Sequence, residues 1–345
     1  MKKNLPSHPQ NQTTGRAKSA STVARLNAEI RFATLVSIAT NRKTVAGVMG
    51  LLLCLWFAPV QAQQRMMFTQ YMFNGLAINP AYAGSQGSLD LTALAREQWI
   101  GLEGAPSTQT FSAHAPLPNK RAALGLLLTH DRIGVSAQTG VYAIYAYRVK
   151  MKHGTLSAGL QAGFDSYRTG FSRVKTESDG DQHFSVDNAQ GFLPNFGTGV
   201  YYATKRFYAG VSAPQLLNNL YPGNEQSRAR QFRHWFASAG YVFDLNPDLK
   251  LKPNVLLKAV QGAPVSVDLN ANLLIKETLW VGMSYRSLDA LSWLVELQAS
   301  PKIRIGYAYD MTVSPLKQVN SGSHELMLNY RVSLQKSKIV TPRYF

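Results

Sequence analysis

From Gly87 onward, apolar and polar residues alternate with a period of two along most of the chain. In 156–164, Leu, Ala and Phe occupy the even positions, and Ser, Gly and Gln occupy the odd ones. The same alternation returns in 303–310 and 326–333. Successive side chains of a β-strand point to opposite faces, so this pattern predicts strands with one apolar face for lipid and one small or polar face.

We predict fourteen such strands, and an even number of this length favours a closed barrel. Membrane-spanning strands need about 9–11 residues when they are tilted. The sequence therefore predicts an all-β fold, a transmembrane up-and-down antiparallel β-barrel of about 14 strands. The expected strands lie at 87–98, 107–115, 121–131, 138–150, 154–166, 193–204, 205–213, 232–244, 248–260, 264–275, 277–287, 289–299, 302–313 and 322–334.

A soluble β-sandwich is the alternative for the same alternation. Its polar faces would be rich in Lys and Glu, whereas the polar rows here are rich in Gly and Ser. Aromatic residues at strand ends are typical of the girdles of membrane barrels. The residues expected in these girdles are Trp99, Tyr147, Trp235, Tyr241 and Trp280.

The connections differ in length, as in barrels with tight turns on one side and loops on the other. Two are long, 168–192 and 214–231. We expect the long loops to face the outside of the cell and the short turns to face the periplasm. Short turns are expected at 152–154, 204–206, 246–248 and 287–289.

The beginning of the chain is typical of a targeting segment. Arg42 and Lys43 precede the apolar run 44–57, and the small residues of 60–62 suit signal peptidase. We expect export with cleavage after Ala62, since the run is shorter than the roughly 20 residues of a transmembrane helix. The expected organisation is an extension and signal peptide (1–62), a periplasmic or plug segment (63–86), an outer-membrane barrel (87–334) and a tail (335–345).

Composition agrees with this class and excludes some chemistry. Only 16% of residues are charged, with 16 Tyr and 26 Gly. The single cysteine, Cys54, lies in the apolar run, so the mature chain would have no disulfide, no Cys-bound metal and no cysteine nucleophile. Cleavage would leave 28 Lys and Arg against 18 Asp and Glu. We expect this basic excess in the lumen and loops, with no nucleic-acid partner, because no run of five basic residues occurs.

No motif for catalysis, a cofactor or a metal is present, so we expect a protein that is not an enzyme. His130-Asp131 is the most suggestive pair, although a polar cluster is ordinary at a strand end. An acidic cluster in the first long loop could bind Ca²⁺, but its spacing departs from an EF-hand and favours a solvated loop. That cluster is Glu177, Asp179, Asp181 and Asp187.

Three motifs in order resemble one known family. The first is FTQYMFN at 68–74, which runs into LAINPAYAGS at 76–85. The second is REQWIG at 96–101 with GAPSTQT at 104–110, and the third is the terminal PRYF at 342–345. The chain from Met67 to Phe345 thus resembles the PorP/SprF family of the type IX secretion and gliding machinery of Bacteroidota.

The resemblance implies a non-enzymatic outer-membrane barrel that assists secretion or cell-surface anchoring of cargo proteins. It also implies that the partners are type IX components and secreted or surface cargo, beside outer-membrane lipid. An outer-membrane channel for small solutes is the alternative, and it requires an open lumen.

The apolar segment 68–81 is unsuited to a free tail. We expect it to pack in the barrel mouth, against a periplasmic partner, or as a plug in the lumen. Trp99 is expected at the membrane interface, and the tail suits either a docking peptide or a barrel-assembly signal. The candidates for partner contact are Tyr71, Asn79, Pro80, Tyr82, Trp99, Arg343, Tyr344 and Phe345.

Overall fold

A computed structural model describes residues 66–170, 189–222 and 229–333, all within the compact unit Val60–Phe345. None of the helices in these ranges is long and apolar enough to cross a membrane. The strands are β1 (Leu89–Glu97), β2 (Ser107–Pro116), β3 (Ala122–Ile133), β4 (Ser136–Lys150), β5 (Thr155–Thr169), β6 (Ala189–Ala203), β7 (Phe207–Ala213), β8 (His234–Tyr241), β9 (Phe243–Asn246), β10 (Leu249–Val260), β11 (Ser266–Ile275), β12 (Leu279–Arg286), β13 (Ala290–Gln298), β14 (Ile303–Thr312) and β15 (Ser323–Val332).

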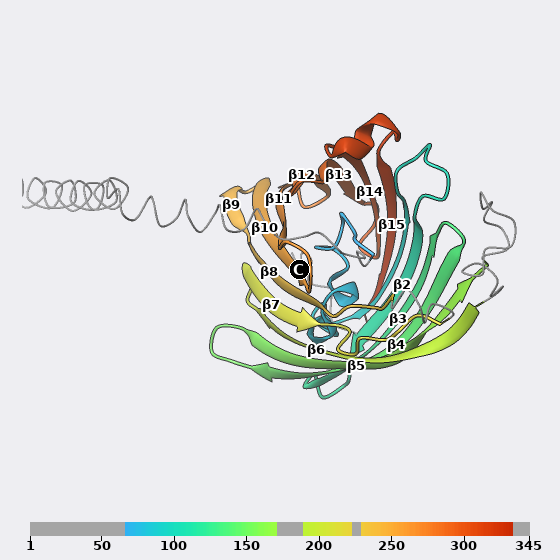
Figure 1. Cartoon of the computed structure of the whole chain (residues 1–345). Coiled ribbons are helices and arrows are strands. Elements are labelled where there is room, and N and C mark those ends of the chain that lie inside the picture. The colour runs from blue at the N-terminus through green and yellow to red at the C-terminus, as the bar shows by residue number, and fades with distance from the viewer. Residues whose placement is uncertain (1–65, 171–188, 223–228, 334–345) are drawn as a thin grey trace, which may run out of the picture. The chain divides into compact units, whose positions relative to one another are not determined.

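The strands close into one antiparallel barrel. Apart from β8 and β9, neighbours in sequence pair with each other, β15 pairs with β1, and β10 pairs with β8, β9 and β11. Since β8 and β9 both lie along β10, they form two halves of one interrupted strand. The prediction of a closed fourteen-stranded barrel is therefore confirmed. Figure 1 shows the strands as a ring around the blue N-terminal segment.

The predicted strand 232–244 is interrupted at Val242, between β8 and β9. Its ladder to β10 ends at the pair Gly240 and Asn254. The next residue of β10 toward its start is Pro253, which has no N–H to donate. On the other side, the Val242 N–H continues the ladder toward β7 and bonds to the Arg206 carbonyl, at 2.7 Å. A proline in the facing strand thus explains why one predicted strand becomes two.

The faces of the strands follow the period of two. In β5, Leu160 on the outer face is 61% exposed, and Gln161 on the lumen face is 3% exposed. The same alternation holds in β14 and β15. One girdle prediction was wrong, because Trp280 is 7% exposed and lies on the lumen face of β12, whereas Tyr147 and Trp235 are exposed.

The barrel has a turn end and a loop end, named here by their connections. The turn end carries 117–121, 151–154, 204–206, 247–248, 276–278 and 299–302. Among the described residues, the loop end carries 98–106, 134–135, 170, 214–222, 229–233, 261–265, 287–289 and 313–322. The turn 287–289 is short, as expected, but it lies among the loops. Leu288 makes this tight reversal possible by adopting a left-handed conformation, with φ of 60°.

Candidate functional site

The N-terminal segment 66–87, called the plug from here on, lies inside the lumen. It contains the short helices η1 (Gly75–Ala77) and η2 (Pro80–Tyr82). Its apolar side chains form a single core cluster with lumen-facing residues of the wall. For example, Phe73 packs on Trp280 with ring centroids 5.9 Å apart. The buried plug residues of this cluster are Phe68, Tyr71, Met72, Phe73, Leu76, Ala77, Ala81, Tyr82 and Ala83.

Two wall carboxylates hold the beginning of the plug. The Glu325 carboxylate accepts the backbone N–H groups of Thr69 and Gln70, both at 2.8 Å. The Thr69 hydroxyl donates to Asp310 at 2.7 Å. Hydrogen bonds to a charged acceptor are stronger than neutral ones. The plug is therefore fixed by its backbone as well as by apolar packing.

Arg96 of β1 joins these groups into one buried network. Its Nη2 lies 2.6 Å from Asp310, and its Nη1 lies 3.0 Å from Glu325. Nη1 also donates to the Thr69 hydroxyl, at 3.2 Å. Arg96 is only 1% exposed. A planar guanidinium suits this place because it serves two carboxylates and the plug at fixed geometry.

The Asn79-Pro80 pair shapes the middle of the plug. Asn79 caps η2, since its Oδ1 accepts the Ala81 N–H at 2.9 Å, and Pro80 occupies the first helical position. The Asn79 Nδ2 donates to the Val200 carbonyl of β6 at 3.1 Å. In addition, the Ser212 hydroxyl of β7 donates to the Ile78 carbonyl at 2.6 Å. This turn is thus bonded to two neighbouring strands.

Wall glycines make room for the plug at three places. A Cβ on Gly159 would overlap the backbone of Ala81. A Cβ on Gly199 would overlap the Asn79 side chain, and one on Gly306 would overlap the Gln70 side-chain amide. The glycines that the sequence places in the small, polar strand rows therefore include positions of close backbone approach.

Replacing Gly159 by Ala is expected to destabilise the plugged state by about 1–3 kcal/mol, because backbone cannot move aside as a side chain can. The matched control is Gly306→Ala, where the obstacle is the end of a flexible amide. Urea unfolding of the purified barrel, followed by tryptophan fluorescence, checks both variants. Equal stability losses for the two would contradict a close fit between the plug backbone and β5.

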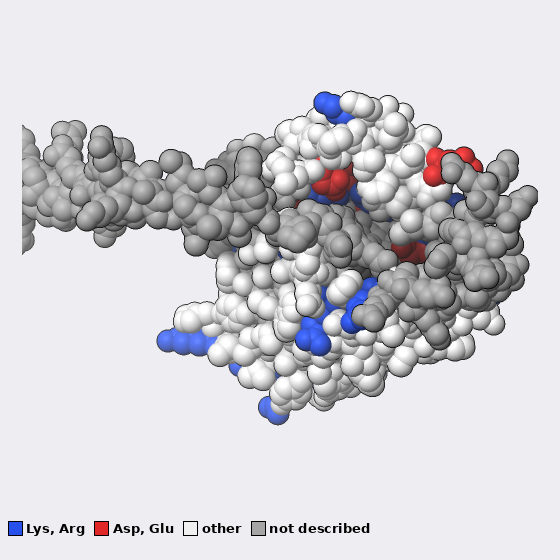
Figure 2. All heavy atoms as spheres, viewed as in Figure 1, with Lys and Arg blue, Asp and Glu red and all other residues white. Residues whose placement is uncertain are grey.

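The charges of the lumen balance. Six buried cations and six buried anions face inward among the described residues. Asp268, for example, lies 2.7 Å from Lys258 and 3.4 Å from Arg286. Figure 2 shows acidic and basic groups side by side in the opening of the ring. The twelve are Arg96, Lys252, Lys258, Arg286, Arg304 and Arg331 with Asp90, Asp165, Asp268, Glu296, Asp310 and Glu325.

The plug tyrosines are neutral hydrogen-bonding groups. Burial raises the pKa of Tyr71 well above its ordinary value and also raises the pKa of Tyr82. The Tyr71 hydroxyl accepts from Asn270 of β11, and the Tyr82 hydroxyl accepts from Gln86, both at 2.7 Å. These hydroxyls thus keep their polar bonds inside a packed lumen.

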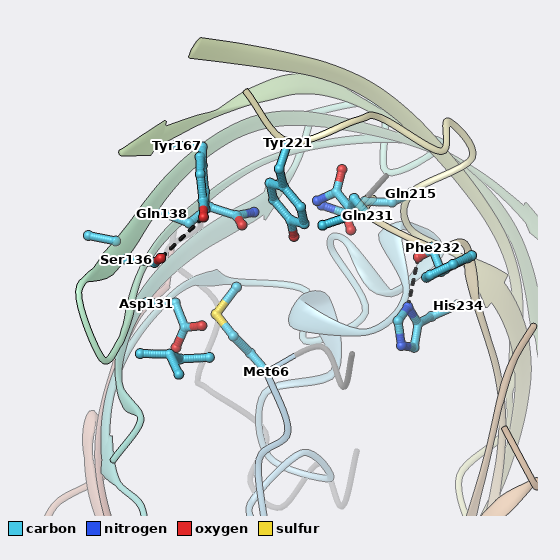
Figure 3. A pocket seen from close by; sticks show the side chains of 13 residues that line it. Met66, Asp131, Ser136, Gln138, Tyr167, Gln215, Tyr221, Gln231, Phe232 and His234 are labelled. Atoms are coloured by element: carbon cyan, nitrogen blue, oxygen red, sulfur yellow. Dashed lines mark hydrogen bonds between the residues drawn. The ribbon is translucent and has the colours of Figure 1, made fainter. Parts of the chain in front are cut away.

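A pocket of about 330 Å³ opens at the loop end, above the beginning of the plug. Figure 3 shows Met66 of the plug facing Tyr167 of β5 and Tyr221 of the second long loop. The two tyrosine rings lie 4.6 Å apart between centroids. Burial, with Tyr167 nearby, raises the pKa of Tyr221 to about 12.

The floor of this pocket is polar and ordered. The Gln231 Nε2 donates to Asp165 at 2.9 Å, and the Gln215 Nε2 donates to the Tyr142 hydroxyl at 2.8 Å. Aromatic rings, amides and a carboxylate therefore converge on one recess, a combination common in ligand and peptide sites. The lining residues are Met66, Asp131, Ile133, Ser136, Ala137, Gln138, Tyr167, Gln215, Tyr221, Ala229, Gln231, Phe232 and His234.

The structure brings four of the expected contact residues together inside the lumen. Tyr71, Asn79 and Tyr82 are 2%, 4% and 5% exposed, and Pro80 is buried. Their contacts are with this chain's own wall. Trp99 lies half-buried in the loop after β1, with φ of 47°, and its backbone N–H donates to the Ser323 hydroxyl. Arg343, Tyr344 and Phe345 lie outside the described residues, as do Cys54 and the cleavage position after Ala62.

The pair His130-Asp131 does not form a catalytic unit. His130 is exposed and contacts the Thr139 hydroxyl at 2.8 Å, whereas the Asp131 carboxylate accepts from Thr108 on the lumen side. Consecutive strand residues point to opposite faces, which separates the two side chains. No group of three potential metal ligands occurs among the described residues. The acidic cluster 177–187 falls outside them.

Sequence reasoning missed the network of Arg96, Asp310 and Glu325. Each stands on the polar face of a predicted strand, where a charge in a wet lumen is ordinary. The available signal was the position of Arg96 within the motif 96–101, which contributes a buried cation to the lumen. Their convergence on Thr69 depends on barrel closure between β1 and β15, and no local pattern shows that.

This geometry defines a class of protein: a closed, antiparallel membrane barrel whose lumen is filled by its own N-terminal segment. The sequence model of the family described as "Type IX secretion system membrane protein PorP/SprF" matches residues 60–330. The chain belongs to this family. The match includes both the plug and the barrel.

The chain was also compared with curated proteins and with solved structures, and the likeness to solved structures concerns the fold alone. No curated protein matches the chain. Among solved structures, it is similar to the Acinetobacter baumannii outer membrane protein Omp33, with 9% identity, a TM-score of 0.43, and coverage of 71% of this chain and 99% of that one. It is also similar to the CymD monoaromatic hydrocarbon channel, with 13% identity, a TM-score of 0.45, and coverage of 81% and 97%.

Proposed function

We propose that this protein is a non-enzymatic outer-membrane component of the type IX machinery that assists the secretion or surface anchoring of cargo proteins. Membership of the PorP/SprF family supports the assignment of this chain to the type IX machinery. The observation that carries the scaffold role is the filled lumen, in which the plug is held by Arg96, Asp310 and Glu325. A barrel closed by its own chain serves binding better than diffusion of solutes.

The alternative, a channel for small solutes, needs a continuous water path. The plug occupies that path with buried apolar side chains, including Phe73, Leu76 and Tyr82. Its displacement would expose this surface and break the bonds to Glu325. The channel is therefore the second candidate.

The loop-end pocket is the favoured contact for cargo or a type IX component. With the long loops facing outside, as is usual for such barrels, this pocket opens on the cell surface. Its pair of tyrosines, Tyr167 and Tyr221, offers apolar contact, and Gln138 offers an amide. The residues of the plug first expected to touch a partner are buried below it, so their role is to support the pocket from within.

Affinity purification from gently solubilised outer membranes, with mass spectrometry, tests the proposal. We expect type IX components or a large secreted cargo to accompany the full chain, and Tyr221→Ala to reduce their recovery several-fold. The matched control is Lys317→Ala, which changes an exposed loop-end residue outside the pocket. Recovery of the barrel alone, with steady conductance in a planar bilayer, would favour the channel.

A further inference from the structure

The basic excess of the chain is concentrated at the turn end. There, ten Lys and Arg side chains stand against Asp244, Asp248 and Glu277. The loop end is nearly balanced in the described ranges, with five basic and four acidic groups, and the lumen is balanced. The ten, called the collar, are Lys120, Arg121, Arg148, Lys150, Lys152, Lys205, Arg206, Lys250, Lys276 and Lys302.

The collar runs from the β2–β3 turn around the barrel to the β13–β14 turn. Each of the six turns either contains a Lys or Arg or, in the case of 247–248, lies two residues from Lys250. Two collar members are neutralised by ion pairs, Arg206 with Asp244 and Lys250 with Glu277. Within the described part of the chain, seven make no ion pair: Lys120, Arg121, Lys150, Lys152, Lys205, Lys276 and Lys302. In Figure 2, basic groups project at the outer edge of the molecule.

The collar lies directly beside the outward apolar band. Tyr147 and Val149 precede Lys150, and both are 46–47% exposed. Phe243 lies shortly before the turn 247–248 and is 48% exposed. Ile303 lies directly after the turn 299–302 and is 37% exposed. Apolar residues at the end of a spanning strand mark the interface of the membrane. Arg148 and Lys250 stand in the lumen-facing rows of β4 and β10. The other eight collar residues stand on or beside tight turns, so their ammonium and guanidinium groups lie at headgroup depth.

We propose that the collar binds the phosphate-bearing headgroups of anionic phospholipids in the leaflet on the turn side. A protein with an acidic face would contact one sector of the barrel end, whereas these charges are spread over six successive turns. A ring of cations at headgroup depth fits the ring of lipids that surrounds a barrel. This inference does not depend on the cargo role, and its test needs no cargo.

Electron paramagnetic resonance of spin-labelled lipids tests the proposal on the full chain reconstituted in phosphatidylcholine vesicles. We expect spin-labelled phosphatidylglycerol to associate about threefold more strongly than labelled phosphatidylcholine, and high salt to weaken this preference. The triple variant Lys152→Gln, Lys205→Gln, Lys302→Gln should bring the ratio toward one. Its matched control, Arg132→Gln, Arg168→Gln, Lys317→Gln, removes three loop-end charges and should keep the preference.

Three results would overturn the proposal. They are equal association of the two lipids with the unaltered chain, an unchanged ratio in the turn-end variant, and an equal fall in the loop-end control. If the turn-end variant does not fold, the salt dependence of the unaltered chain decides instead. Loss of a co-purifying protein from the turn-end variant, with unchanged lipid preference, would assign the collar to an acidic protein.

Discussion

A chain lacking residues 67–83 is expected to form a conducting pore, in contrast to the intact chain. The deletion removes the apolar plug side chains and leaves a lumen lined by balanced charges such as Asp268 and Arg286. Fourteen strands lie between small barrels filled by their own side chains and porins of 16–18 strands with an aqueous channel. Single-channel current in planar bilayers should therefore rise by about an order of magnitude or more over the intact chain.

The matched control for this deletion is a substitution that loosens the plug without removing it. Phe73→Ser disrupts the contact with Trp280 but keeps the backbone bonds of Thr69 and Gln70 to Glu325. We expect brief, small openings from this variant. A folded deletion variant, confirmed by its heat-modifiable mobility in gels, that stays electrically silent would show that the plug is not the barrier in the lumen.

The period of two predicted the barrel because side chains on the outer face of a strand must be apolar where they contact lipid. Leu160 and Leu328 are identifiable as outward residues from local sequence alone, since each stands in an unbroken apolar row. The same rule explains why fourteen strands could be counted. The wrong assignment of Trp280 has the opposite cause. An aromatic residue near a strand end suits either face, and its partner Phe73 lies about 200 residues away in the chain.

The interior could not be predicted to the same depth. Lys252 is fully buried with its Nζ 5.1 Å from the centre of the Phe73 ring, yet in the sequence it is one of two alternating lysines at the start of β10. The role of Gly159 likewise depends on where Ala81 arrives. Both facts follow from long-range closure and from the path of the plug, which no local period encodes.

Replacing Arg96 by Met is expected to be the most damaging single change to stability. Arg96 is 1% exposed, and its removal leaves the carboxylates of Asp310 and Glu325 buried without their shared cation. Breaking a buried ion pair from one side costs about 3–5 kcal/mol. The loss should appear as a lower urea midpoint, and the plug should become cleavable by added protease because the Thr69 hydroxyl loses the hydrogen bond that Arg96 donates to it.

A second substitution distinguishes charge imbalance from simple loss of packing. Adding Glu325→Gln to Arg96→Met removes one of the two stranded charges and keeps one acceptor oxygen, which can serve the backbone N–H of either Thr69 or Gln70. The double variant should therefore recover part of the lost stability, and Arg96→Lys should retain more than Arg96→Met. The exposed control, Arg132→Met, should change the urea midpoint little. If the double variant is less stable than Arg96→Met alone, the network acts through shape, and the plug is held mainly by its apolar contacts.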